Sequence, residues 1–94
     1  MEAPDTVQGG VAFSVQVHTE GANGCWRRHR TDVSVDGLVA TIVPRDEKPG
    51  RGQTCTQAPV EILHEASVTF AGPGNGRVDV VGRGGTASVD VVVE

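Results

Sequence analysis

The chain has 94 residues, enough for one small domain whose thin core gains from an added constraint. Its formal net charge of -4 argues against general nucleic-acid binding, and no apolar run approaches the roughly 20 residues that cross a bilayer. Valine supplies most of the hydrophobic content, glycine is frequent, and the only aromatic residues are Phe13, Trp26 and Phe70. This composition predicts an all-β domain.

The chain contains only two cysteines, Cys25 and Cys55. In a small β-rich chain they predict a disulfide and an oxidising compartment, and the alternative is a pair of buried free thiols in a cytosolic protein. The opening Met-Glu-Ala-Pro-Asp is typical of a mature exported protein to which an initiator Met has been added, so we expect its leader to have been removed. The expected location is secreted, periplasmic or in the cell envelope.

The first half of the chain predicts a flexible N-terminus over residues 1–6, followed by a single domain over residues 7–94. Valines and Phe13 alternate with polar residues over residues 11–17, which is typical of a half-buried strand. A turn over residues 20–24 then leads into a hairpin over residues 25–43.

The predicted hairpin turns at Asp36-Gly37, a pair preferred where both central residues need positive φ. In its second strand, three residues are expected to face the core and three to face away: Leu38, Ala40 and Ile42 against Val39, Thr41 and Val43. Residues 44–54 are rich in charge, Pro and Gly and predict a loop.

The second half of the chain predicts further strands. Ala66, Val68 and Phe70 alternate with polar residues, with a helix over residues 58–66 as the alternative. Gly-rich turns over residues 72–76 and 82–85 separate two more strands. The last one, which ends at residue 94, is expected to be an edge open to strand addition, with Asp90 and Glu94 guarding it against aggregation. About seven strands in this spacing predict a sandwich or barrel.

Three short motifs carry a family resemblance: Asn23-Gly24-Cys25, the Cys-Thr-Gln-Ala-Pro segment over residues 55–59, and Gly-Arg-Val-Asp-Val over residues 76–80. Together they resemble small exported bacterial domains with an immunoglobulin-like β-sandwich, in which an Asn-Gly-Cys turn and a later Cys-Thr segment are joined by a disulfide. The resemblance spans roughly residues 7–83. It implies an immunoglobulin-like antiparallel β-sandwich of about seven strands without a substantial helix, and it implies export.

No catalytic constellation is recognisable, because the serines fall at ordinary strand positions and no nucleophile-elbow sequence occurs. We therefore expect no enzyme activity, no catalytic residues and no cofactor. The three histidines His18, His29 and His64 are scattered and are expected to be solvated. A metal site formed by their convergence in space is the alternative.

The segment 26–30 combines a Trp with three arginines and a His, residue types that are typical of binding hot spots. Strand alternation predicts that Arg28 and Arg30 share a face with Trp26, and that Arg27 and His29 share the other. Alternatively, Trp26 packs beside the disulfide and the arginines pair with neighbouring acids. Together with the cations of the 44–54 loop, the binding candidates are Trp26, Arg27, Arg28, Arg30, Arg45, Lys48 and Arg51.

These observations predict a non-enzymatic exported or cell-envelope module that acts in protein interaction or as a structural domain. A small secreted enzyme inhibitor and a His-based metal-binding protein are the alternatives. An inhibitor predicts that the Trp/Arg patch or the 45–54 loop protrudes, whereas a module predicts that Trp26 is buried. The expected partner is another protein, without nucleic acid or membrane insertion, and the chain is expected to be a monomer or a weak edge-strand dimer.

Overall fold

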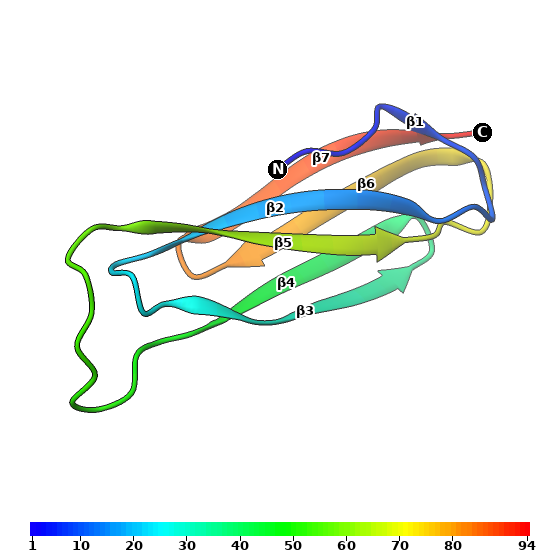
Figure 1. Ribbon diagram of the computed structural model, residues 1–94. Helices are drawn as coiled ribbons and strands as arrows, with labels where there is room; N and C mark the ends of the chain where they lie inside the picture. The colour runs from blue at the N-terminus through cyan, green and yellow to red at the C-terminus, as the bar shows by residue number, and fades with distance from the viewer.

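The computed structural model describes all 94 residues and contains seven β-strands in two sheets (Figure 1). The all-β class and the number of strands are confirmed, and no helix occurs, so none could span a membrane. The larger sheet has the order β1-β7-β6-β4-β3 and the smaller one pairs β2 with β5. The strands are β1 (Thr6–Val7), β2 (Phe13–Gly21), β3 (Arg27–Asp36), β4 (Val39–Glu47), β5 (Val60–Val68), β6 (Gly74–Gly82) and β7 (Gly85–Val93).

The core lies between the two sheets and is built by alternation along the strands. In β5 every second residue is buried, from Ile62 to Val68, so the helix alternative for residues 58–66 is wrong. Phe70 is fully buried and its ring centroid lies 5.7 Å from that of Phe13. Small β-branched side chains fill the remaining space, as the valine-rich composition predicts.

The larger sheet is mixed, which corrects the prediction of a purely antiparallel sandwich. Strand β4 pairs with β6 in parallel, and β1 pairs with β7 in parallel. The chain leaves β4, crosses to the smaller sheet as β5 and returns as β6, so β4 and β6 run in the same direction. Strands β4 and β6 are neighbours in one sheet, but the chain between them passes through the other sheet. Local sequence patterns do not reveal such a pairing.

The β3–β4 hairpin is confirmed, but its turn lies one residue later than predicted. Asp36 pairs with Val39, so Gly37 and Leu38 are the two loop residues. Gly37 has φ of +61°, and positive φ occurs in this chain only at glycines. This matches a hairpin turn with glycine at its first central position. Ala40 and Ile42 are fully buried, as predicted for the core-facing side of β4.

Strand β4 continues to Glu47, so the loop predicted to begin at residue 44 begins at residue 48. Pro44 is tolerated within the strand because it pairs with Thr31 on β3 but lies beyond Ile42, the last β4 residue that pairs with β6. The resulting loop 48–59 projects from one end of an elongated molecule that measures 50 × 20 × 17 Å (Figure 1).

The N-terminal segment bridges the two sheets. Glu2 exchanges backbone hydrogen bonds of 2.8 and 2.9 Å with Gln16 of β2, whereas β1 pairs with Val92 and Val93 of β7. Strand β7 is therefore an edge only over its first part, which corrects the prediction that its whole length is open. The expected flexibility of residues 1–6 stays a prediction.

Candidate functional site

The predicted disulfide is confirmed and organises one end of the molecule. Cys25 and Cys55 are bonded, with their Cα atoms 5.4 Å apart. The bond ties the turn that follows β2 to the loop that precedes β5. We call this end the disulfide pole; it comprises Cys25, Trp26, Cys55 and the loop 48–59.

Trp26 is half-buried at the disulfide pole and is held from two sides. Its Cβ lies only 2.2 Å from where a Cβ on Gly21 would be, so the indole packs directly on the glycine backbone at the end of β2. On the other side, the Arg83 guanidinium carbon lies 4.4 Å from the ring centroid, a cation–π arrangement. Trp26 therefore supports the pole, and it does not project as a free tip.

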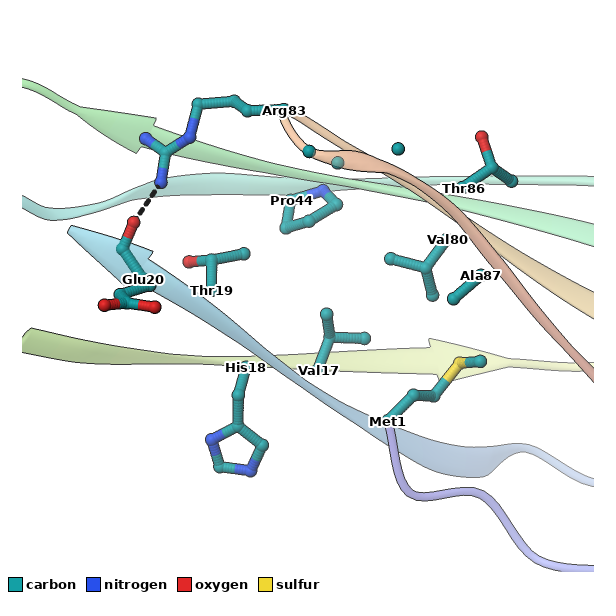
Figure 2. A pocket seen from close by; sticks show the side chains of 13 residues that line it. Met1, Val17, His18, Thr19, Glu20, Pro44, Val80, Arg83, Thr86 and Ala87 are labelled. Carbon is teal, nitrogen blue, oxygen red and sulfur yellow. Dashed lines mark hydrogen bonds between the residues drawn. The ribbon is translucent and has the colours of Figure 1, made fainter. Parts of the chain in front are cut away.

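Arg83 connects Trp26 to the interior. Its Nη2 donates a 2.6 Å hydrogen bond to the Glu20 carbonyl oxygen (Figure 2). The same Nη2 lies 3.1 Å from Asp46 Oδ2. The Asp46 side chain is 1% exposed, and its other oxygen lies 2.7 Å from His64 Nε2. Arg83 is not among the residues predicted from the sequence; its only signal there is a lone cation in the Gly-rich turn 82–85.

His64 is fully buried, so the prediction of three solvated histidines is wrong for this residue. It occupies an inward position of β5, between Ile62 and Ala66, and the alternation of that strand is a signal that could have placed it inside. Its Nδ1 lies 2.7 Å from Thr31 Oγ1 and its Nε2 lies 2.7 Å from Asp46 Oδ1. With a hydrogen on Nε2 the ring donates to Asp46, and Nδ1 shares the second hydrogen bond with the Thr31 hydroxyl, so all three groups have partners.

The Thr31 hydroxyl, the His64 imidazole and the Asp46 carboxylate are hydrogen-bonded in the same order as the three groups of a hydrolase triad. However, the His64 ring has no exposed surface, and none of the four main cavities is lined by Thr31, His64 or Asp46. The network instead joins β3, β4, β5 and the β6–β7 turn with satisfied polar groups, which is what buried polar atoms need for stability.

Arg27, one of the predicted binding arginines, pairs with an acid on its own hairpin. Arg27 Nε lies 2.7 Å and His29 Nδ1 3.2 Å from the Glu47 carboxylate. The hydrogen bond from Arg27, assisted by its charge and by His29, lowers the pKa of Glu47. Because the groups are exposed, we expect this pairing to add little to stability.

A second cluster forms around Asp32. Arg45 Nε lies 2.5 Å and Arg30 Nε 3.3 Å from Asp32 Oδ2. The hydrogen bond from Arg45 and the charges of both arginines lower the pKa of Asp32. Arg30 and Arg45 are thus engaged within the sheet.

A β-bulge changes the predicted faces of the segment 26–30. Arg28 pairs with Asp46 and Arg30 with Arg45, so His29 is an extra residue. Cross-strand partners point to the same face, and Asp46 points inward while Arg45 is exposed. Arg28 and Arg30 therefore lie on opposite faces, which overturns the prediction that they share one.

The remaining candidates are exposed and form no ion pair: Arg28, Lys48 and Arg51. Arg51 sits in a turn in which Gln53 N donates to Gly50 O (3.3 Å) and Gly50 N donates to Gln53 Oε1 (3.0 Å). Gly52 has φ of +75° at the third position, which is the pattern of a type II turn with Arg51 at the second. The loop 48–59 thus presents a cation on a hydrogen-bonded tip.

The histidines remain apart in the structure. His18 pairs with Glu61, His29 with Glu47, and His64 has partners on both ring nitrogens. No group of three or more His, Cys, Asp or Glu side chains is arranged to hold a metal ion.

Comparison with protein-family models, with curated proteins and with solved structures finds no match for this chain.

Proposed function

We propose that the protein is an exported, non-enzymatic immunoglobulin-like β-sandwich module that binds an acidic surface of another protein through the disulfide pole. The observation that carries this proposal is the tip of the loop 48–59, where Arg51 is exposed, free of ion pairs and held in a hydrogen-bonded turn. Arg is the cation most often found in binding hot spots, because its guanidinium grips carboxylates with two hydrogen bonds.

The disulfide supports this function physically. Cys55 lies within the loop 48–59 and is bonded to Cys25, so the loop is anchored at Cys55 as well as at its two ends in β4 and β5. Anchoring reduces the conformational entropy that the loop would lose on binding. A disulfide also favours export, since such bonds persist in oxidising compartments. The immunoglobulin-like assignment rests on the two-sheet core and the motif resemblance.

The test uses charge reversal at the unpaired cations. The variant Arg28→Glu/Lys48→Glu/Arg51→Glu and the single variant Arg51→Glu are compared with Arg77→Glu. The last matches the single variant in charge and lies on β6 at a residue paired with Asp79. The probe is a fluorescein-labelled deca-glutamate peptide, and its anisotropy is followed at increasing salt. We expect salt-sensitive binding that the triple variant loses and the control keeps. Absence of binding, or equal loss in the control, would contradict the proposal.

A secreted enzyme inhibitor is a second candidate, favoured by the same tip. Arg51 is exposed in a hydrogen-bonded turn and is followed by Gly52. Such a segment resembles the substrate of a protease that cleaves after arginine. The test is titration of trypsin with the protein. An inhibitor remains uncleaved and blocks hydrolysis of a small arginine substrate, and the Arg51→Ala variant does not. Rapid cleavage after Arg51 without inhibition would eliminate this candidate.

A further inference from the structure

A groove beside β2 is lined by no residue of the loop 48–59 that carries the proposed function. It is a cavity of about 540 Å³ between the outer edge of β2 and the β6–β7 hairpin (Figure 2). Val17, Thr19, Pro44, Val80 and Ala87 line it, and Met1 lies at one side. We call it the strand groove.

The two sheets do not match in width, which leaves the strand groove uncovered. Five strands on one side face only two on the other. Along the inner face of β7 burial decreases from Val93 and Val91, which are buried, through half-buried Val89 to exposed Ala87. Ala87 is thus on the core-facing side of its strand and still exposed. A third strand beside β2 would cover it.

The outer edge of β2 offers free backbone groups along the groove. Gln16 directs both its N–H and its C=O away from β5, to Glu2, and the β2–β5 register runs without a shift. With the period of two, His18 and Glu20 present their backbone groups to the same side. The Glu20 carbonyl accepts from Arg83, as this geometry requires, but no partner is present for the His18 N–H and C=O or for the Glu20 N–H.

The N-terminal residues of the chain show how such an edge is filled. Glu2 pairs antiparallel with Gln16, which places Met1 opposite Val17, at the rim of the groove. A strand that preceded Met1 in the same register would place its residues opposite His18, Thr19 and Glu20. A strand that continued this line would extend an interface that already exists within the molecule.

One polar atom in the groove lacks a partner. Thr19 Oγ1 is buried and makes no hydrogen bond. Thr19 is on the inward side of β2, like Val15 and Val17, so a residue paired with it would point its side chain into the cavity. A serine or threonine at that position could supply the absent hydrogen bond.

From these observations we infer that the strand groove binds an extended segment of a second polypeptide, antiparallel to β2, with a hydroxyl residue opposite Thr19. The segment would form backbone hydrogen bonds with His18 and Glu20, and its inward side chain would cover Ala87 and Val80. This is binding by strand addition to a sheet edge. Affinity comes from the backbone bonds and selectivity from the side chain in the cavity.

The test uses one peptide in two forms. Acetyl-Lys-Val-Thr-Val-Lys-Gly-amide is added at millimolar concentration to the ¹⁵N-labelled protein, and its first four residues are also fused directly before Met1, which places the Thr opposite Thr19. A control peptide carries Pro in place of each Val and cannot form the backbone bonds. Amide hydrogen exchange is measured by NMR. We expect exchange at His18 and Glu20 to slow by about tenfold or more in both forms, and not with the control.

Two matched variants locate the binding. Ala87→Trp fills the groove and should abolish protection, whereas Ala71→Trp, at an exposed residue outside the groove, should not. Thr19→Val should shift the preference toward a peptide with Val in place of Thr. Charge reversal at Arg51 should leave protection unchanged, which separates this inference from the proposed function.

Three outcomes would overturn the inference. One is the absence of protection with either form of the peptide. Another is protection along β3, an edge strand of the larger sheet, in place of β2 in the smaller sheet. The last is protection in the fused chain alone, which would show that a separate polypeptide does not bind there.

Discussion

Replacing Cys25 and Cys55 by serine is expected to lower the thermal midpoint of unfolding by about 15–20 °C. The bond closes a loop with a sequence separation of 30. In the chain-entropy model, a loop of this length restricts the unfolded chain by an amount worth about 3.6 kcal/mol at 25 °C. An unfolding entropy of about 2.1 cal/mol/K per residue makes each kcal/mol worth about 5 °C in a chain of this size.

The assay is differential scanning calorimetry of the wild type and the double serine variant, each with and without reducing agent. Reduction should lower the midpoint of the wild type to near that of the variant, and it should leave the variant unchanged. A fall of less than about 5 °C would refute the reasoning, because the unfolded chain would then gain little freedom when the bond is absent. A response of the serine variant to the reducing agent would show that the measured shift has another cause.

Asp46→Asn should destabilise the fold by about 3 kcal/mol in urea unfolding, because it removes the negative charge that faces Arg83 and His64; a change below about 1 kcal/mol would show that the network contributes little. Gly37→Ala should cost about 1 kcal/mol by forcing a side chain into positive φ, whereas Gly84→Ala in the β6–β7 turn should be close to neutral, and equal effects would refute the turn assignment. Because Arg27 holds the pKa of Glu47 below its ordinary value of 4.5, their pairing stabilises the fold above that pH and is lost as the pH falls through the lowered pKa. In Arg27→Gln the Glu47 pKa should rise toward 4.5 in an NMR titration of the side-chain carboxyl carbon, and an unchanged value would assign the shift to another group.

Local patterns predicted the strands well, because alternation and turn chemistry act over a few residues. The hairpin around Gly37 and the alternating burial of β5 follow from such signals. Predictions were wrong where one extra residue interrupts the strand alternation, and where the direction of neighbouring strands depends on pairing between distant parts of the chain. The bulge at His29 reverses the face of Arg28, and the crossover through β5 makes β4 and β6 parallel.

The candidate site was predicted in part. The disulfide followed from the two cysteines, and the free cations Arg28, Lys48 and Arg51 were among the binding candidates. The network of Asp46, His64 and Arg83 joins residues that are far apart in the chain, so no local spacing reveals it. The strand groove depends on the unequal widths of two sheets, which is a property of the assembled fold.

The parallel pairing of β1 with β7 makes the beginning and the end of the chain neighbours. A chain that emerges from a ribosome or a translocation channel with its N-terminus first therefore holds β1 without a partner until its last strand is available. Strand β6 can pair with β4 earlier, but its other edge has no partner until β7 is available. The larger sheet can close only after β7 has emerged, so folding is expected to follow emergence of this strand and to be slow, as pairing over long sequence separations usually is.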